Sequence, residues 1–274
     1  MYGLIKRCCL VLYVPQWAES SSFPDSERVN FVCNIAGSSF DSWLRTPYIP
    51  RGDANRINIQ INFTMRTCDL YHEPEQLQQC KEAFKLLYYE AESDFANAMR
   101  PTWDTQVYRH IDVIAADSTF VDPHDFVVNS ETRSIPVTNN GVYFAFLDQG
   151  ACVTLMAVRI YYIVCPEVTR AFALFPNTTT SIVLSTVVEA QGRCVPHAVI
   201  EEQPKYHCGG NGDWQIMTGG CQCMPGYQPL HPGNDQECTG RSRSFSRSRS
   251  CRSRWVSTTI ISDARFFFQF LFRK

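Results

Sequence analysis

The longest apolar run of the chain, residues 142–165, has the pattern of two β-strands. A membrane-spanning helix requires about 20 uninterrupted apolar residues, whereas Asp148-Gln149-Gly150 interrupts this run near its start and Arg159 near its middle. Both apolar pieces are rich in β-branched and aromatic side chains, which favour strands. Periodicity alone leaves a buried helix open. We predict two strands joined by a turn, and no membrane span.

A second pattern begins at Arg56, where apolar and polar side chains alternate up to Met65. Side chains two positions apart share one face of a strand, so the isoleucines and Phe63 should face a core while the polar residues face water. Asn62 belongs to the polar face, where a glycan can be attached. Further strands are predicted at residues 29–35, 84–90, 108–114 and 126–129.

Turn signals separate these strands, for example Pro50-Arg51-Gly52-Asp53 and Asn139-Asn140-Gly141. No long amphipathic helix pattern precedes residue 165, and short strands with polar turns favour a β-sandwich. From Cys165 onward the cysteines are more closely spaced and glycine is more frequent. This is typical of a small module stabilised by disulfides more than by a core. The predicted fold is therefore all-β: a sandwich followed by a disulfide-rich module.

Thirteen cysteines occur in this chain of 274 residues. Together with two N-glycosylation sequons, Asn62-Phe63-Thr64 and Asn177-Thr178-Thr179, they indicate an oxidising compartment. Zinc sites usually use closely paired cysteines, and apart from the adjacent Cys8 and Cys9 the one tight pair is Cys221-Gln222-Cys223. Because His207 precedes Cys208, a zinc site in the second half stays an alternative. We expect disulfides and no metal.

The net charge of −2 conceals an uneven distribution. Residues 239–274 contain nine Arg and Lys and one Asp, which leaves 16 basic and 26 acidic side chains in residues 1–238. Nucleic-acid binding depends on clustered Lys and Arg, so we expect no nucleic-acid partner for the acidic part. The Arg-Ser stretch within residues 239–274 predicts a disordered tail. An RNA-associated role of this tail is a lesser alternative.

Residues 1–16 begin with a basic portion and continue with an apolar one, as secretory signals do. No small-residue cleavage site follows, and Pro15 and Trp17 come early. We interpret these residues as an atypical N-terminus with a weak signal-like pattern, which leaves secretion of the chain open.

Five stretches, in the same order along the chain, resemble the Eph receptor tyrosine kinases. They are VCNI (32–35), SWLRTPYIPRG (42–52), CKEAFKLLYY (80–89), HIDVIAAD (110–117) and GVYFAFLDQGAC (141–152). The resemblance covers roughly residues 27–238. It corresponds to the ephrin-binding domain of the family and the start of its cysteine-rich region.

The resemblance implies a jelly-roll β-sandwich over residues 17–164, without its first strands. A sushi-like module (165–222) and the start of an epidermal-growth-factor-like module (223–238) would follow. The implied function is that of the extracellular ligand-binding portion of an ephrin receptor, which binds a cell-surface ephrin in contact-dependent cell-cell signalling. The implied location is the plasma membrane of the parent receptor. Receptor clustering is a further implied interaction, and no cofactor is expected.

The same resemblance implies five disulfides. The implied pairs are Cys33–Cys152 and Cys68–Cys80 in the sandwich, and Cys165–Cys208, Cys194–Cys221 and Cys223–Cys238 in the modules that follow. Spacing alone does not determine these pairings. A bridge that closes a loop of over a hundred residues is expected to stabilise the fold by roughly 4 to 5 kcal/mol on the chain-entropy model.

In the family, a hydrophobic loop of the ephrin enters a channel whose floor includes the disulfide that corresponds to Cys33 and Cys152. Strand alternation then assigns Thr154 and Met156 to the same face as Cys152. The resemblance therefore nominates these four residues as ligand contacts.

Thr64 and Arg66 share a face on the strand that ends near Cys68. Arg66 corresponds to an arginine that, in the family, meets an acidic side chain of the ephrin loop. From the sequence alone, we would interpret Arg66 as a solvated arginine near a turn. Thr67 replaces the acidic residue that is usual in the family beside this arginine.

Three further positions carry weaker expectations. Phe126 and Tyr71 align with mobile loops that line the channel, although either can equally be a core residue. Ala36 stands where relatives commonly have larger apolar side chains, which would widen the channel.

Two other functions fit parts of the sequence less well. A secreted jelly-roll lectin that binds carbohydrate is an alternative, because one fold can serve several functions. Catalysis has no support from motifs: the six histidines are dispersed, and neither a phosphate-binding glycine loop nor a metal-holding Asp-Phe-Gly is present. Kinase activity would require sequence beyond this chain, so we expect no enzyme activity from it.

Overall fold

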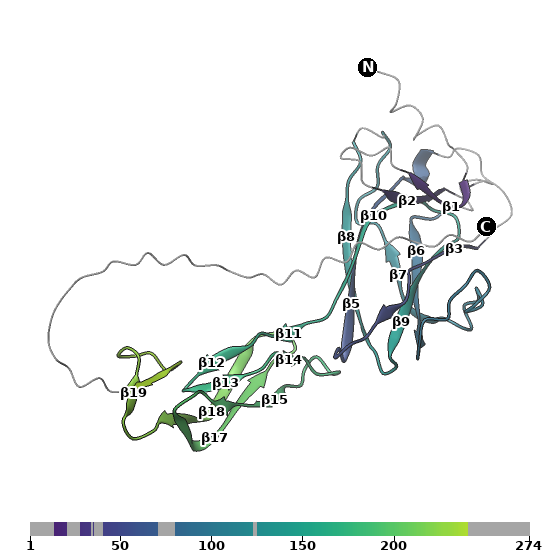
Figure 1. Cartoon of the computed structure of the whole chain (residues 1–274). Helices are drawn as coiled ribbons and strands as arrows, with labels where there is room; N and C mark the ends of the chain where they lie inside the picture. The colour runs from purple at the N-terminus through teal and green to yellow at the C-terminus, as the bar shows by residue number, and fades with distance from the viewer. Residues whose placement is uncertain are drawn as a thin grey trace. The chain divides into compact units, whose positions relative to one another are not determined.

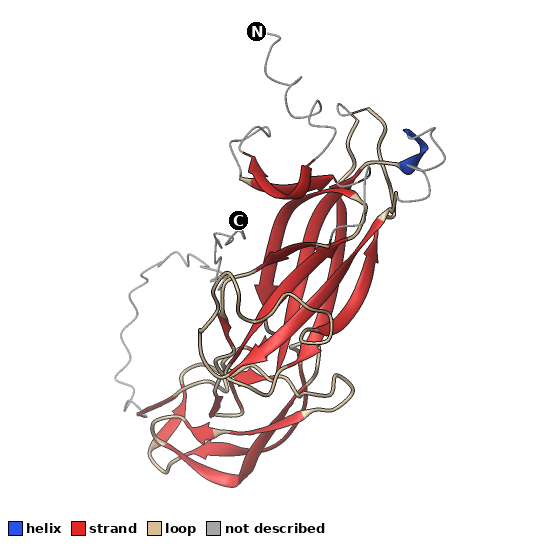
Figure 2. Cartoon of the chain, turned by 90° about the vertical axis from the view of Figure 1, so that its right-hand side faces the viewer, coloured by secondary structure: helices blue, strands red, loops and turns tan. Residues whose placement is uncertain are grey.

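The computed structural model describes residues 14–20, 28–33, 35, 41–70, 80–122 and 125–240. These residues form two compact units, divided between Tyr161 and Tyr162. Strands make up most of both units, and the 3-10 helix η1 (Cys68–Leu70) is the one helical element in the described ranges (Figure 2). The prediction of an all-β protein is confirmed.

The first unit contains two antiparallel sheets (Figure 1). Sheet I consists of β1 (Val14–Ser20), β2 (Val29–Cys33), β5 (Arg56–Met65), β8 (Asn129–Pro136) and β10 (Cys152–Tyr161). Sheet II consists of β3 (Ser42–Arg45), β4 (Ile49–Pro50), β6 (Ala83–Ala91), β7 (Arg109–Ala115) and β9 (Gly141–Asp148). The order is β1-β2-β10-β5-β8 in sheet I and β3-β9-β6-β7 in sheet II, with β4 also paired to β9. Neighbouring strands therefore often come from distant parts of the chain.

One apolar core lies between the two sheets. Phe84 of β6 packs edge to face on Phe63 of β5, with ring centroids 5.2 Å apart, and its ring lies 6.2 Å from that of Phe146 on β9. All three rings are buried within a single apolar cluster. Because each strand presents alternate side chains to opposite faces, both sheets contribute one face to this cluster. The two sheets form the β-sandwich that the sequence predicts.

The apolar run at residues 142–165 folds as two strands, as predicted. Every residue of β9 is buried, which explains why its sequence shows no polar alternation. The following turn contains Gly150 with φ of 126°, a backbone conformation that favours glycine. β9 and β10 do not pair with each other, because one lies in sheet II and the other in sheet I. The turn therefore carries the chain between the two layers.

β5 shows the predicted alternation, but its polar face is open to water only in the middle. Asn62 is half-buried, whereas Asn58 and Thr64 near the two ends are 8% and 2% exposed. Tyr161 lies beside Asn58 in the β10 ladder. At the other end, the N–H of Phe120 donates to the carbonyl of the last β5 residue, so a further segment borders Thr64.

The strand predicted at residues 126–129 is wrong. β8 begins at Asn129, and the preceding Val127 and Val128 are exposed in a connecting segment. β8 pairs only with β5 within the described sheets. An edge strand of this kind is rich in Ser, Thr and charged residues, so an apolar pattern identifies it poorly.

The other predicted strands are present with small shifts. β6 and β7 agree with the predicted ranges to within one residue at each end, whereas β2 ends at Cys33, two residues early. The apolar pattern did not identify β3, which has only four residues.

The second unit contains short sheets around a small aromatic core. Its strands are β11 (Val164–Cys165), β12 (Val168–Arg170), β13 (Ala173–Phe175), β14 (Thr178–Thr179), β15 (Val188–Gln191), β16 (Arg193–Cys194), β17 (Ala198–Cys208), β18 (Trp214–Cys223), β19 (Tyr227–Pro229) and β20 (Cys238–Gly240). Tyr206 stacks on Trp214 with centroids 4.7 Å apart and contacts Phe175 at 5.3 Å. A core of this size agrees with the predicted disulfide-rich module.

Replacing Phe84 by Ala should destabilise the first unit by about 3 to 5 kcal/mol, because the cavity removes the ring contacts with Phe63 and Phe146. Urea unfolding followed by tryptophan fluorescence measures this loss. Met99, which is 80% exposed, supplies the control. Met99→Ala should change the free energy of unfolding by less than about 0.5 kcal/mol. Equal effects of the two substitutions would contradict the core position of Phe84.

Candidate ligand-binding surface

A disulfide joins β2 and β10 at their ends. Cys33 is the last residue of β2 and Cys152 the first of β10, and the two stand opposite each other in the antiparallel ladder. They are 7% and 6% exposed, and they form a small apolar cluster with Ile35 against which Cys80 packs. The bridge closes a loop with a sequence separation of 119. It fixes the start of β10 relative to β2.

Beside this disulfide, one row of side chains crosses three strands of sheet I. Thr154 of β10 stands opposite Phe31 of β2 and opposite Thr64 of β5. Val153 and Leu155, the neighbours of Thr154 along the strand, are buried in the core between the sheets. Because successive side chains point to opposite faces, Thr154 and Thr64 lie side by side on the outer face of sheet I.

Strict alternation along β10 ends at Met156. The pairing register with β5 shifts between Leu155 and Ala157, which leaves Met156 as the extra residue of a β-bulge. Beyond the bulge, Val158 and Ile160 pack against the core. The alternation rule therefore does not apply to the half-buried Met156, and its contact with a ligand stays a prediction.

Arg66 directly follows β5 and lies beside the Cys33–Cys152 disulfide. Its backbone N–H donates to the carbonyl oxygen of Cys152 over 3.0 Å. Its side-chain Nε is buried and has no hydrogen-bond partner among the described residues. An unpaired buried donor is costly, so an acceptor group from a bound partner would stabilise this guanidinium.

Two buried polar residues hold the segment that follows β5. The N–H of Thr67 donates to the carbonyl of Phe120 over 3.0 Å, and its Oγ1 accepts from the N–H of Asp69 over 3.2 Å. The side chain of Asn129 accepts from the N–H of Ser118 and donates to the Ser118 carbonyl, both over 2.9 Å. Asn129 was not predictable from the sequence, because a single Asn at the start of a polar strand has no distinctive pattern.

The Cys68–Cys80 disulfide borders the same surface through Cys80. The N–H of Cys68 donates to the carboxylate of Glu82 over 2.7 Å, which supports the start of η1. Tyr71, between these two cysteines, and Ala36 lie outside the described residues.

Phe126 is half-buried in the segment that leads into β8. The first residue of β8, Asn129, stands opposite Phe63 near the end of β5. The segment therefore approaches the end of sheet I from which Arg66 follows. A contact between Phe126 and a ligand stays a prediction.

Asp148 holds the turn from which β10 starts. Its Oδ1 accepts from the N–H of Ala151 over 2.7 Å, and its Oδ2 accepts from the N–H of Gly150 over 3.4 Å. The carbonyl of Gly150 in turn accepts from the N–H of Lys81 over 2.9 Å, next to Cys80. Burial raises the pKa of Asp148 to about 6, although the N–H donors and Lys81 oppose this shift. The sequence indicated the turn but not the role of this carboxylate.

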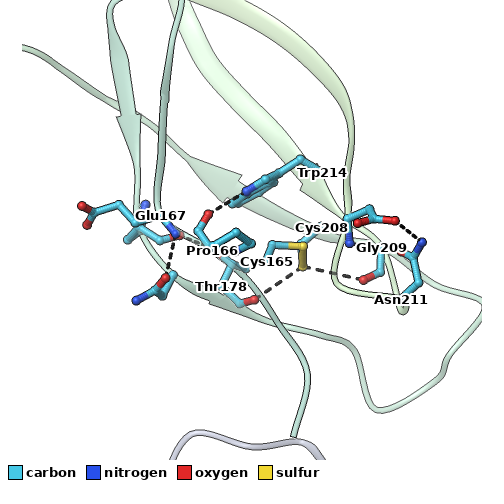
Figure 3. The surroundings of a disulfide bond; sticks show 11 residues. Cys165, Pro166, Glu167, Thr178, Cys208, Gly209, Asn211 and Trp214 are labelled. Carbon is cyan, nitrogen blue, oxygen red and sulfur yellow. Dashed lines mark hydrogen bonds between the residues drawn. A yellow bond between two sulfur atoms is a disulfide. The ribbon is translucent and has the colours of Figure 1, made fainter. Parts of the chain in front are cut away.

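The second unit contains the disulfides Cys165–Cys208, Cys194–Cys221 and Cys223–Cys238. With the two in the first unit, these are the five pairs that the resemblance implies. Near Cys165 and Cys208, the indole N–H of Trp214 donates to the carbonyl of Pro166 over 2.8 Å (Figure 3). Both cysteines of this disulfide are fully buried.

The predicted glycosylation residue of this unit, Asn177, is exposed, and its Oδ1 accepts from the N–H of Glu167 over 2.7 Å. The cysteines of the alternative zinc site are not available as ligands, because the sulfurs of Cys208, Cys221 and Cys223 are all bonded to other sulfurs. In the described ranges, no cluster of His, Cys, Asp and Glu side chains is arranged to hold a metal ion. Within the same ranges, no helix is long and apolar enough to cross a membrane.

A β-sandwich with two disulfides beside one outer surface, followed by a small disulfide-rich unit, is typical of binding modules of secreted and cell-surface proteins. The family model of the ephrin receptor ligand binding domain matches residues 9–165, and that of the ephrin cysteine rich domain matches residues 166–223. The chain belongs to the family of the ephrin receptor ligand binding domain.

Curated relatives agree with this membership. The chain is 37% identical over 257 residues to ephrin type-B receptor 3 of Xenopus laevis and 40% identical over 218 residues to that of Homo sapiens. It is 38% identical over 244 residues to ephrin type-A receptor 4-B of Xenopus laevis. These matches cover 90%, 78% and 86% of this chain but 26%, 22% and 24% of the relatives. The chain spans about a quarter of their length.

Removing the Cys33–Cys152 bridge by two Cys→Ala substitutions should lower the free energy of unfolding by about 5 kcal/mol on the chain-entropy model. Removing Cys68–Cys80, with a sequence separation of only 12, should cost about 3 kcal/mol. Denaturant titrations of the oxidised proteins compare the two losses. A larger loss for the shorter loop would contradict this ranking.

The raised pKa of Asp148 gives a pH dependence of known sign. In the folded protein the carboxyl group titrates near 6 rather than 3.8, so the folded state binds the proton more tightly than the unfolded state and stability falls as pH rises through this window. The cost at pH 7 is about 3 kcal/mol. Asp148→Asn should lose this slope, which urea midpoints at pH 4, 5, 6 and 7 measure. Identical slopes in both proteins would refute the role of Asp148.

Proposed function

We propose that this chain is the ephrin-binding portion of an ephrin receptor and that the outer surface beside the Cys33–Cys152 disulfide receives the ligand. Membership of the ligand binding domain family supports the ligand class. The observation that carries the choice of surface is the buried, unpaired Nε of Arg66, directly beside this disulfide. An unsatisfied buried donor is costly, and a hydrogen-bond acceptor supplied by a ligand would remove this cost.

Two kinds of contact would act together. An apolar ligand loop gains about 25 cal/mol for each Å² that it buries, and the apolar cluster of Cys33, Cys152 and Ile35 supports a surface on which it can settle. An acidic ligand side chain would pair with Arg66 in a charge-assisted hydrogen bond, worth about 1.5 to 3 kcal/mol. Thr154 would flank this contact on the outer face, whereas Thr64, which is 2% exposed, offers almost no surface to a ligand.

The lectin alternative is not favoured, because both matching family models describe ephrin receptor domains. The relatives are receptors, which supports an extracellular position of this surface on a parent receptor in the plasma membrane. We expect no catalysis from residues that match a ligand-binding and a cysteine-rich domain, and kinase activity would belong to other sequence. Clustering of receptors is a further expectation.

The Arg66→Glu variant tests this function. Surface plasmon resonance on immobilised A-type and B-type ephrin ectodomains should show binding by the wild-type chain and an affinity reduced at least about tenfold by Arg66→Glu, since a lost charge-assisted bond costs about 1.5 kcal/mol or more. Arg193→Glu makes the same charge change at an exposed position of the second unit and should leave the affinity unchanged.

Thermal unfolding of all three proteins separates lost binding from lost folding. The proposal fails if folded wild-type protein binds no ephrin of either type. The assignment of the surface fails if Arg66→Glu and Arg193→Glu have the same effect.

A further inference from the structure

Asn62 occupies the middle of β5 on the outer face of sheet I. Its neighbours across the two ladders are Ala157 of β10 and Ser130 of β8. Both are exposed and both have small side chains, so they leave open space above the asparagine. Ile61 and Phe63, on either side of Asn62 along the strand, are fully buried in the core. Asn62 therefore faces solvent, while the side chains of its two neighbours along the strand are fixed in the core.

The hydrogen bonds of this row leave the reactive atom of the Asn62 side chain open. Ser130 Oγ–H donates to Asn62 Oδ1 over 2.9 Å, and Gln60 Nε2–H donates to Ser130 Oγ over 3.3 Å. Among the described residues, none of the hydrogen bonds involves Asn62 Nδ2. The bond from Ser130 therefore fixes the orientation of the amide without occupying its nitrogen.

We propose that Asn62 carries an N-linked glycan that borders the ephrin-binding surface and limits access to it. Asn62-Phe63-Thr64 is the acceptor sequon, and the donor class is an oligosaccharide linked to a lipid through pyrophosphate. Nδ2 bonds to the anomeric carbon of the first N-acetylglucosamine and loses one proton, while the lipid pyrophosphate departs. The oligosaccharide is transferred while the unfolded chain enters the secretory pathway. The burial of Thr64 in the folded protein therefore does not prevent the transfer.

The strand geometry determines where the glycan begins. Thr64 and Arg66 follow Asn62 on the same face, two and four residues along, which corresponds to about 7 and 13 Å on an extended chain. A branched, hydrated glycan that starts there covers the polar outer face and occupies one side of the approach to Arg66. The effect on access rests on the proposed function, whereas the attachment of the glycan does not.

Glycopeptide mapping tests the attachment. The full chain, preceded by a cleavable secretion leader, is produced in animal cells, and glycans are released by peptide N-glycosidase in heavy-oxygen water, which converts each glycosylated Asn into labelled Asp. Asn62 should be labelled. Thr64→Ser retains the sequon and should retain the label, whereas Thr64→Val, of similar shape, should lose it. An unmodified Asn62 peptide in the wild-type chain overturns the proposal. If the chain is not secreted, the same peptide mapping is carried out on the protein retained inside the cell.

Ephrin binding tests the effect on access. Trimming the glycans to a single N-acetylglucosamine, or replacing Asn62 by Gln, should raise the association rate with immobilised ephrin several-fold. Asn177→Gln removes the other sequon and should leave the rate unchanged. A glycosylated protein whose rate does not respond to trimming refutes the effect on access. If no variant binds any ephrin although Asn62 is glycosylated, the proposed function fails and the attachment stands.

Discussion

The disulfide between Cys33 and Cys152 is the constraint on which the proposed ligand surface depends. It joins the end of β2 to the start of β10, strands from the two ends of the sandwich sequence. The carbonyl of Cys152 accepts the backbone N–H of Arg66, and Cys80 of the second disulfide packs against the bridge. The ends of β2 and β10 and the backbone of Arg66 are therefore held together around this covalent bond. The buried carboxylate of Asp148 supports it by closing the preceding turn.

Under the proposed function, the two faces of sheet I have different roles, one in stability and one in ligand recognition. The inner face supplies apolar side chains such as Ile59 and Phe63 to the core, and this burial provides most of the free energy that holds the sandwich together. The outer face is polar and retains a buried donor without a partner at Arg66. An unsatisfied buried donor destabilises the free protein. Such a cost is typical of functional sites, where a bound partner supplies the missing hydrogen-bond acceptor. The same outer face contains Asn62, the proposed glycan attachment residue, between the small side chains of Ala157 and Ser130.

Much of this architecture could be predicted from the sequence. β5 and the pair β9 and β10 were predictable because period-two alternation and long apolar runs follow directly from burial on one or both faces. β8 was not, because an edge strand can satisfy its pairing with Ser and Thr and needs few apolar residues. The β-bulge at Met156 was not predictable either, because the apolar pattern does not show the extra residue. The ligand surface was predicted only through the family resemblance. The unpaired Nε of Arg66 and the hydrogen bonds of Asn129 to Ser118 depend on the tertiary structure, so the sequence did not indicate them.

Hydroxyl-radical footprinting of the free and ephrin-bound protein tests the central claim most directly, because it reports which side chains a ligand covers. Phe31, in the row of Thr154 beside the Cys33–Cys152 disulfide, and the nearby Met156 should both lose reactivity in the complex. Met224, exposed in the second unit, should react equally in both states. Unchanged oxidation of Phe31 and Met156 in a saturated complex would contradict the account.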